Sequence, residues 1–506
     1  MKWSVALMVV LIAFSSSFAG TYGIHHPTDA VQESGSADES TYIPEMRWLS
    51  EEHPLISAEQ VEHYAGVGIS EGKRAVIMYE NGSVSYDYFS SGNDAYDLII
   101  IAPDDWKDSL APLQQHKESH GIQTMVVGLN EIYGGTYFSV QGRDDAEKIK
   151  YFIKNAIEEW GIEYVMLVGS YYRLPMRNAV HIWEDRHRLV TFAIPTDLYY
   201  ADIYRYEGGT IVFSTWDTNG NGVYGEVYED GLGENDIIDV YPDVYVGRLA
   251  CENERIVRNM VKKIIKYENK AYGEEWFKRM ILVGGDTFPG WGVVEGEFMN
   301  NFVADIMKGF SFYRIQYSQG NLNAVEIEKA LEKGAGFLYY SGHGFPYGWA
   351  TYAIDDENET WVGRYFTPYI AALFNGYRLP VIFLDACLTA KLDFNSSDLR
   401  EDGVPMPINA TFPCFAWSFV RHPYGGAIAT VGATRVAFTG VDEEGPHWGA
   451  GLLAASFFET YQETDILGEV FAGAQEAYAN NAPGDTFTLQ EFILLGDPTL
   501  KIGGYA

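Results

Sequence analysis

Strand-length apolar runs alternate with amphipathic helical patterns along most of this 506-residue chain, and this alternation constrains the fold more than any other feature. Apolar runs at 98–102, 123–127 and 164–168 are separated by helical patterns at 105–120 and 144–160. A strand–helix–strand order makes successive strands parallel, with helices packed on the sheet. The first half of the chain therefore predicts a doubly wound, mostly parallel sheet.

The same alternation resumes after an irregular stretch at 170–250. It is carried by predicted helices at 252–270, 295–308 and 323–333, and by predicted strands at 279–283, 312–317, 336–340, 381–385 and 426–431. We predict an α/β fold with two adjoining doubly wound, mostly parallel sheets and flanking helices. Its N-terminal α/β subdomain covers 96–250, and its C-terminal α/β subdomain covers 251–506.

Two reactive side chains follow directly after two of these apolar runs. The run GFLYY leads into SGHG, which contains His343, and the run VIFLD leads into Ala386 and Cys387. Open α/β sheets bind ligands at the carboxyl ends of their strands, so His343 and Cys387 can face one cleft. A thiol needs a nearby proton acceptor to become an attacking thiolate, and an imidazole can supply it and later protonate the leaving amine.

The spacing and the neighbours of this pair are also suited to a thiol hydrolase. Cys387 follows His343 by 44 residues, close to the spacing of about 50 residues in caspases. The backbone amides of Gly344 and Cys387 are candidate donors to an oxyanion. The alternative interpretation is structural, because a single Cys at a strand end is commonly a small buried hydrophobic residue.

The blocks YYSGHGFPYGWA and LDACLTAKLDF resemble the catalytic blocks of gingipain-type cysteine peptidases, and further matches follow in the same order from about 97 to 502. This resemblance implies a caspase-like fold and a secreted cysteine endopeptidase that cleaves protein or peptide substrates after Arg or Lys. No cofactor is needed for that chemistry. The alternatives are a transpeptidase that uses the same Cys–His site and a catalytically idle binding protein on this fold.

The resemblance also assigns roles to acidic residues. Asp286 follows the run ILVGG at the place of the acid that orients the catalytic His, although an Asp there can equally cap a turn. Asp442 falls where the lysine-cleaving type carries its pocket acid, and Glu295 or Glu297 falls near the acid of the arginine-cleaving type. Acids are abundant in this chain, so each match can be accidental, and Arg435 is close enough in sequence to neutralise Asp442.

The segment DTNGNG at 217–222 matches the opening of a calcium-binding loop. Asp217, Asn219 and Asn221 would supply ligands, and Glu226 or Glu229 would replace the missing acid at the twelfth position, which is Tyr228. The alternative is a turn-rich loop that uses Asn and Gly for their backbone geometry. A structural calcium ion is thus one of two open predictions for this loop.

Composition and the first residues indicate where the protein acts. Seventy Asp and Glu against 35 Lys and Arg give a formal net charge of −35, which would repel nucleic acid. Residues 1–19 have the basic start, apolar centre and small-residue end of a signal peptide, so we expect an extracellular protein with no membrane association after cleavage. The tail LLGDPTL resembles the closing block of the gingipain catalytic domain, and we expect no immunoglobulin-like or sorting domain after it.

Residues 20–95 are predicted to be a leader or propeptide-like region with a small β element. The alternating segments 74–79 and 84–89, joined through Asn81-Gly82, indicate a hairpin. In an enzyme that cuts after basic residues, Arg74 would be a site of self-cleavage or would occupy the specificity pocket and keep the enzyme inactive. The simpler interpretation, which we prefer, is an ordinary charge at the start of a strand. Of the three cysteines, Cys251 and Cys414 are the two that can form a disulfide, and the sequence leaves their state open.

Overall fold

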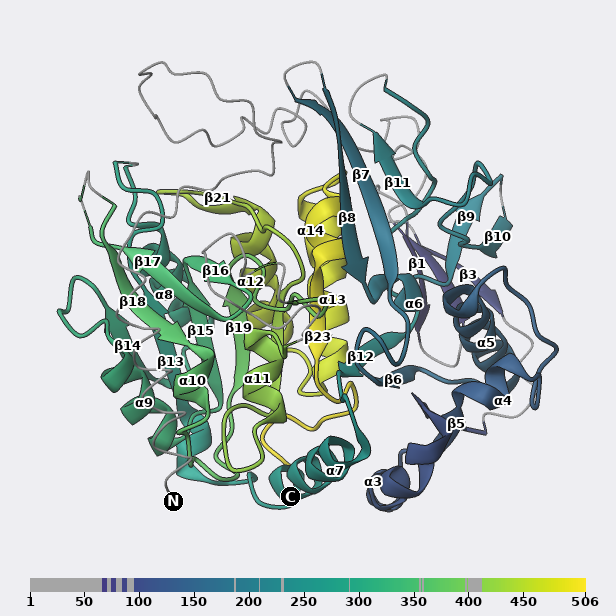
Figure 1. Cartoon of the computed structure of the whole chain (residues 1–506), viewed down its shortest axis with the longest axis horizontal. Helices are drawn as coiled ribbons and strands as arrows, with labels where there is room; N and C mark the ends of the chain where they lie inside the picture. Colours follow the sequence, from purple (N-terminus) through teal and green to yellow (C-terminus); the bar gives the residue numbers. More distant parts are fainter. Residues whose placement is uncertain are drawn as a thin grey trace. The chain divides into compact units, whose positions relative to one another are not determined.

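The computed structural model describes residues 66–70, 74–78, 84–88 and 95–506, apart from 186–187, 209, 229–231, 291, 355, 357–358, 396–397 and 399–411. A ten-stranded sheet runs through this part of the chain (Figure 1). In spatial order its strands are β14 (Ser311–Gln316), β13 (Arg279–Gly284), β15 (Phe337–Ser341), β19 (Val381–Asp385), β20 (Ala429–Ala433), β23 (Phe492–Leu495), β12 (Tyr245–Leu249), β6 (Tyr164–Val168), β4 (Leu98–Ala102) and β5 (Thr124–Gly128).

All neighbouring strands of this sheet are parallel except β20 and β23. The six strands of the second half and the four strands of the first half meet at one residue pair, Arg248 with Leu495. The α/β fold class is therefore confirmed. The two predicted sheets adjoin so closely that they are hydrogen-bonded into one.

Helices cover both faces of the sheet, as alternate residues of β15 show. The ring of Tyr339 lies 5.7 Å from that of Phe458 on α12 (Gly449–Thr460). The next residue, Tyr340, stacks on Trp349, whose ring lies 5.2 Å from Phe415 on α11 (Phe415–Arg421). Since successive side chains of a strand point to opposite faces, α12 and α11 lie on opposite sides.

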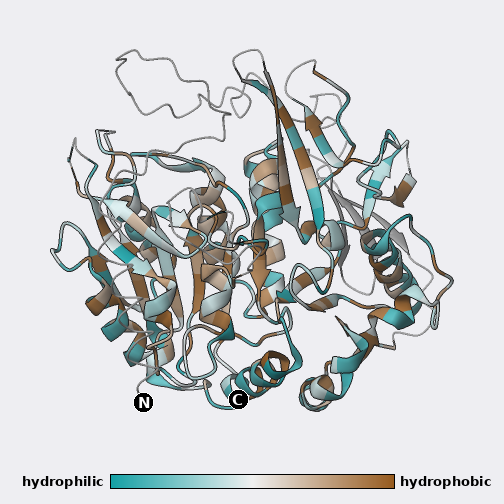
Figure 2. Cartoon of the chain, in the orientation of Figure 1, coloured by the Kyte–Doolittle hydropathy of each residue, from teal (hydrophilic) through white to brown (hydrophobic). Residues whose placement is uncertain are grey.

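Burial on both faces explains the near-continuous apolar runs of these strands. Every residue of β4, β15, β19 and β20 is buried, and Figure 2 shows the brown, hydrophobic colouring of the central strands. The other helices of eight residues or more in the described ranges are α3 (Lys107–Ser119), α5 (Asp145–Trp160), α7 (Glu254–Glu268), α8 (Glu295–Ile306), α9 (Ala324–Lys333) and α13 (Leu467–Asn481).

Smaller sheets surround the main one. The stretch that interrupted the predicted alternation forms a three-stranded sheet of β11 (Tyr224–Tyr228), β7 (Arg177–Asp185) and β8 (Arg188–Thr196). The chain after β15 forms an antiparallel sheet of β16 (His343–Phe345), β17 (Gly348–Tyr352) and β18 (Trp361–Phe366). A two-stranded hairpin of β21 (Thr439–Asp442) and β22 (Gly445–Trp448) follows β20.

The predicted hairpin near the start of the chain is present. Strands β2 (Arg74–Met78) and β3 (Val84–Tyr88) pair antiparallel, and β1 (Gly66–Ser70) pairs with the other edge of β2. Cleavage after Arg74 would thus need the central strand of this sheet to leave its partners. The signal-peptide prediction and the rest of the leader fall outside the described residues, and the subdomain boundaries at 95 and 250 remain predictions.

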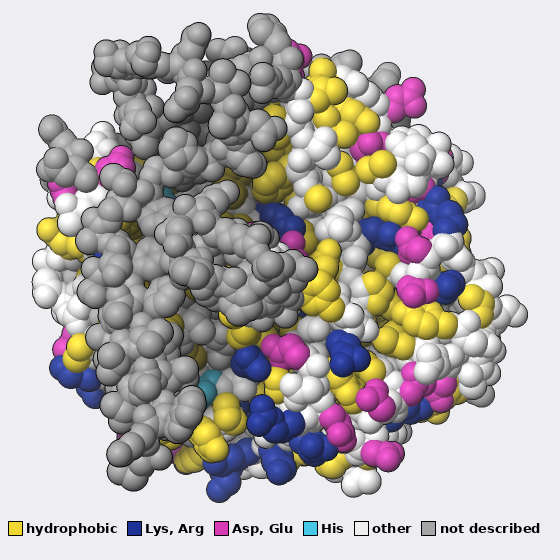
Figure 3. All heavy atoms as spheres, in the orientation of Figure 1, with side chains coloured by type: hydrophobic (Ala, Val, Ile, Leu, Met, Phe, Trp, Pro, Cys, Tyr) yellow, Lys and Arg dark blue, Asp and Glu magenta, His cyan; other side chains and the backbone are white. Residues whose placement is uncertain are grey.

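Basic side chains are few, but five of them follow the exposed face of α7 and its end. These are Arg255, Arg258, Lys262, Lys266 and Lys270, and Figure 3 shows Lys and Arg side chains gathered along the lower edge of the visible face. Five charges do not reverse a net charge of −35, so the exclusion of nucleic acid stays our prediction. In the described part of the chain, no helix has the length and apolar character needed to cross a bilayer.

Candidate active site

His343 and Cys387 leave neighbouring parallel strands at the same level. Strands β15 and β19 are paired up to Ser341 and Asp385, so each reactive residue lies two positions beyond the last pair. The amide of Gly342 donates to the carbonyl of Asp385 at 3.2 Å, which holds the two chains together past the strand ends. Adjacent strands are about 4.8 Å apart. The structure thus brings the predicted pair to one place on the edge of the sheet.

Gly344 lies directly against the backbone of Cys387. A Cβ added at Gly344 would be 2.2 Å from the carbonyl oxygen of Cys387 and 2.8 Å from the Cβ of Ala386. A larger residue would push the strand that carries His343 away from the cysteine. The backbones of Gly344 and Cys387 are therefore in close contact, and their amides remain the predicted oxyanion donors.

The thiol of Cys387 is half-buried and not in a disulfide. Its Sγ donates to the carbonyl oxygen of Ala437 at 3.2 Å. Burial raises the pKa of Cys387 to about 12. At neutral pH the cysteine is therefore a protonated thiol, which would need a base in order to act as a nucleophile.

His343 is held in one orientation by a backbone carbonyl. Its Nε2 lies 2.9 Å from the carbonyl oxygen of Thr287, and because a carbonyl only accepts, Nε2 carries the proton. Burial lowers the pKa of His343 to about 4, while the bond to Thr287 acts in the opposite direction. The rings of Tyr352 and Trp361 flank the imidazole at 4.9 and 5.2 Å. The imidazole is thus neutral, and its Nδ1 can accept the thiol proton.

Asp286 is the residue predicted to orient His343. It is buried, its backbone pairs with that of Tyr352, and its Oδ1 accepts from the amide of Phe288 at 3.2 Å. The carboxylate caps a turn, and its predicted role in orienting His343 stays a prediction. The adjacent Thr287 supplies the carbonyl that holds the imidazole. A backbone carbonyl leaves no signature in the residue type, so the sequence could not reveal Thr287.

Glu295 is predicted to bind a substrate side chain, but in the structure it is buried. It is the first residue of α8 and only 4 % exposed. Its carboxylate accepts hydrogen bonds from the hydroxyl of Ser341, at 2.7 Å, and from that of Thr287. Burial closes Glu295 off from an incoming side chain, which leaves Asp442 and Glu297 as the pocket candidates.

Asp442 is the more accessible of these two acids. It ends β21 with its side chain 57 % exposed, and His447 lies 2.8 Å from it. The hydrogen bond from His447 lowers the pKa of Asp442. Glu297 is half-buried, and its two oxygens accept from the amide and hydroxyl of Ser318 at 2.8 and 2.5 Å.

Arg435 does not neutralise Asp442. Its guanidinium makes two hydrogen bonds to Asp393, at 2.8 and 2.9 Å, and one to the carbonyl of Ala193. Its own carbonyl accepts from the amide of Leu388, directly after the cysteine. Leu388 has a φ of 57°, an uncommon conformation for a large side chain, and it turns the chain sharply after Cys387.

The predicted calcium ligands lie close together, but their side chains are bonded to other protein groups. Glu226 accepts from the side-chain amides of Asn219 and Asn221, at 3.3 and 2.7 Å, and Asp217 pairs with Arg143. In the described ranges no three His, Cys, Asp or Glu side chains form a group that could hold a metal ion. Calcium binding stays a prediction, and a rise in melting temperature with added calcium would support it.

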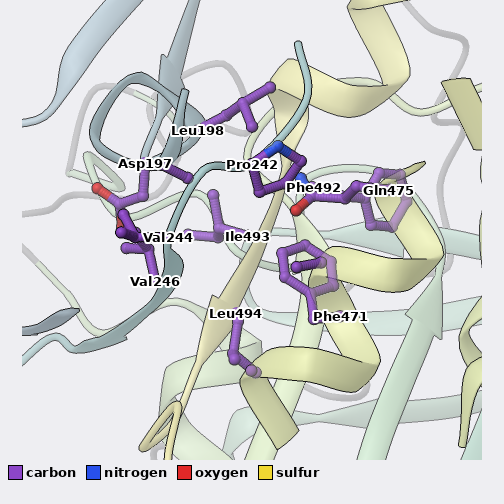
Figure 4. Close-up of a pocket in the computed structure, with 13 residues that line it drawn as sticks. Asp197, Leu198, Pro242, Val244, Val246, Phe471, Gln475, Phe492, Ile493 and Leu494 are labelled. Atoms are coloured by element: carbon purple, nitrogen blue, oxygen red, sulfur yellow. The ribbon is translucent and has the colours of Figure 1, made fainter. Parts of the chain in front are cut away.

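A small cavity lies away from the reactive residues, at the junction of the two halves of the sheet. Figure 4 shows its lining by residues that include Val244, Phe471 and Ile493. Its volume is about 20 Å³, which is room for about one water molecule. It is therefore part of the packing at this junction and cannot hold a peptide.

A histidine and a cysteine at adjacent strand ends of a large, mostly parallel sheet are typical of caspase-like cysteine peptidase folds. The chain belongs to peptidase family C25, whose sequence profile matches residues 91–503. The resemblance to gingipain-type peptidases is thereby confirmed.

Individual relatives are distant. The chain is 21 % identical to gingipain R2 of Porphyromonas gingivalis over 336 residues, which cover 65 % of this chain and 35 % of that protein. It is 20 % identical to Lys-gingipain HG66 of the same organism over 219 residues, 43 % of this chain and 11 % of that one. The chain thus spans about a third or less of the length of the curated relatives it matches.

Two solved structures share the fold. The complex of the Porphyromonas gingivalis RgpB pro- and mature domains superimposes with a TM-score of 0.56 at 19 % identity, over 80 % of this chain and 79 % of that one. The Arg-specific cysteine proteinase gingipain R gives a TM-score of 0.55 at 18 % identity, over 81 % and 78 %. These likenesses establish the fold.

Proposed function

We propose that this protein is a cysteine endopeptidase in which Cys387 is the nucleophile and His343 the general base and acid. This proposal is carried by the positions of the two residues. Each lies two places beyond the paired Ser341 and Asp385, at the ends of adjacent strands. The close contact of Gly344 with the Cys387 backbone supports it. Membership of peptidase family C25 points to the same chemistry.

The chemistry follows from the protonation states of the two groups. The Cys387 thiol passes its proton to Nδ1 of His343 as the sulfur attacks the peptide carbonyl. The resulting oxyanion is bound by backbone amides, for which those of Gly344 and Cys387 are the candidates. Collapse expels the amine, which takes the proton back from His343, and water then hydrolyses the thioester. No cofactor takes part in these steps.

Cleavage after Arg or Lys is the substrate preference we propose, with Asp442 as the pocket acid ahead of Glu297. The curated relatives include proteins named gingipain R2 and Lys-gingipain HG66. Asp442 is exposed, and it ends the strand that begins two residues after Ala437, the hydrogen-bond acceptor of the Cys387 thiol. An acid that pairs with a substrate cation discriminates strongly, because a neutral side chain leaves it unpaired.

Turnover of short reporter peptides under reducing conditions tests the activity. Peptides with Arg or Lys before the reporter should be cleaved, and Cys387→Ala and His343→Ala should abolish turnover. Cys414→Ala, which removes a buried thiol, is the matched control and should retain activity. Absence of cleavage by the folded wild type, with or without an added amine acceptor, would contradict the proposal. Transfer to the amine in place of hydrolysis would favour the transpeptidase.

Replacement of the pocket acid tests the specificity. Asp442→Asn should lower kcat/KM for Arg and Lys peptides at least about tenfold, since the neutral amide no longer pairs with the substrate cation. Hydrolysis of neutral peptides should be unchanged. Glu444→Gln, an exposed neighbour, is the control. An equal fall for basic and neutral peptides would contradict the role of Asp442.

We also propose that the enzyme is exported. The support is the signal-like sequence of residues 1–19. Mass spectrometry of the mature protein, with cleavage near Ala19, tests this localisation, and an intact N-terminus in the culture medium or the cell would contradict it.

A further inference from the structure

Glu295 connects the two segments that hold the histidine. Its carboxylate accepts a hydrogen bond from the hydroxyl of Thr287, whose carbonyl is bonded to Nε2 of His343. It also accepts a hydrogen bond at 2.7 Å from Ser341, two residues before His343. One buried side chain thus bridges the residue that orients the imidazole and the strand that carries it.

Two glycines bring Glu295 into this position. A Cβ at Gly296 would lie 2.7 Å from the carbonyl oxygen of Ser341 and 2.8 Å from that of Gly285, and a Cβ at Gly284 would lie 2.5 Å from the carbonyl of Gly296. The first turn of α8 therefore packs backbone to backbone against the ends of β13 and β15. In this position the Glu295 carboxylate reaches Ser341 at the end of β15 and Thr287, which follows β13.

Acidic groups surround Glu295. Burial raises the pKa of Glu295 to about 7, and the charges of Asp385 and Asp286 add to that rise. Asp385 is itself buried between the strands, accepts from the hydroxyl of Tyr339 at 2.7 Å and lies two residues before Cys387. Three carboxyl groups in such proximity cannot all be ionised at little cost, so protons are retained among them near neutral pH.

We propose that Glu295 is a positioning residue, which aims the Thr287 carbonyl at His343 and so keeps the Nδ1 of the imidazole free for the Cys387 thiol. This inference rests on the proposed peptidase function and adds to it a residue that touches neither the substrate nor the reacting atoms. Without Glu295, the side-chain bridge between Thr287 and Ser341 is lost, and the imidazole can take either tautomer.

The consequences differ between a hydrogen-bonding and a truncated replacement. Glu295→Gln retains a group that can accept from one hydroxyl and donate to the other, so the bridge is kept. Glu295→Ala removes the bridge. We expect kcat to fall more than about tenfold in the alanine variant, with KM changed less than about threefold, because substrate binding does not use Glu295. The glutamine variant should stay within about threefold of the wild type.

A measurement on the imidazole itself separates positioning from stability. In protein labelled with ¹⁵N-histidine, His343 should show a single Nε2–H tautomer, with its signal assigned by His343→Gln. Glu295→Ala should give a mixture of tautomers, and Glu295→Gln should resemble the wild type. Glu476→Gln is the matched control: burial also raises the pKa of Glu476 to about 7, and this residue lies on α13.

The combination of kcat and tautomer distinguishes the possible roles of Glu295. Wild-type kcat together with an unchanged tautomer in Glu295→Ala would overturn the inference. So would a loss of activity with the tautomer unchanged, since Glu295 would then act on stability alone. If the wild type cleaves no peptide but the tautomer shifts as expected, the proposed function fails and the positioning role of Glu295 stands.

Discussion

At the level of single residues, burial decides the resting state of the reactive pair. It raises the pKa of Cys387 to about 12 and lowers that of His343 to about 4. Both groups are therefore neutral between these values, and the thiol is not stored as a thiolate. In the proposed mechanism, activation therefore occurs as the substrate arrives, when His343 takes the proton.

The pH dependence of alkylation tests this resting state. Below the pKa of a thiol the thiolate fraction rises about tenfold per pH unit, so the rate of Cys387 alkylation by iodoacetamide should climb steadily from pH 6 to 9. A rate that is flat over this range would show a stored thiolate and contradict the prediction. Cys251 and Cys414, which are fully buried and not in a disulfide, should react only after denaturation.

Glu295 also predicts how stability varies with pH. Its pKa is raised from 4.5 to about 7 on folding, so between these values the native state binds more protons than the unfolded state. The free energy of unfolding therefore falls as pH rises from about 4.5 to 7. Glu295→Gln should become more stable relative to the wild type over this range, by about 2–3 kcal/mol. Urea unfolding at pH 4.5 and 8 measures this, and an equal difference at both pH values would contradict it.

At the level of elements, the site depends on how closely α8 approaches the strand ends. The backbone contact at Gly296 is too close for any side chain. The helix, the Thr287 segment and β15 therefore act as one unit around the imidazole. The segment after β20 contacts the cysteine: the carbonyl of Ala437 accepts from the thiol of Cys387, and that of Arg435 accepts from the amide of Leu388.

Gly296→Ala should disrupt this unit. The added methyl meets backbone atoms, so the start of α8 must shift, and we expect a loss of about 1–3 kcal/mol in the free energy of unfolding together with reduced kcat. Gly309→Ala, just beyond the same helix, meets no atom within 4 Å. This control should be neutral or stabilising by up to about 1 kcal/mol. Equal stability and activity of the two variants would show that α8 does not need its close approach.

At the level of the whole molecule, a buried lysine links distant parts of the chain. Lys117 on α3 lies 2.8 Å from Glu268 at the end of α7 and 2.8 Å from Asp497 after β23, with no exposure of any of the three side chains. The N-terminal half of the chain, helix α7 and the C-terminal segment thus meet at the ammonium group of Lys117. The block LLGDPTL contributes its aspartate to this contact.

Lys117→Met should be strongly destabilising. It removes the lysine that pairs with both Glu268 and Asp497, and removing one partner of a buried charge network costs about 3–5 kcal/mol. Thermal unfolding measures the effect. Lys266→Met, an exposed lysine on α7, is the control and should change stability by less than about 0.5 kcal/mol. A similar melting temperature for both variants would contradict the structural role of Lys117.

The sequence by itself determined the parallel α/β sheet and the positions of His343 and Cys387 at two strand ends. Both follow from local patterns, since apolar runs form strands and crossover helices make them parallel, which brings their carboxyl ends to one edge. Only the tertiary structure decided what surrounds the pair. The family resemblance placed Glu295 near a substrate pocket, and closeness in sequence placed Arg435 beside Asp442. The turn into α8 buries Glu295, and Asp393 binds Arg435. Residue spacing limits how far a side chain can lie from the site, but its direction depends on packing between segments that are remote in sequence.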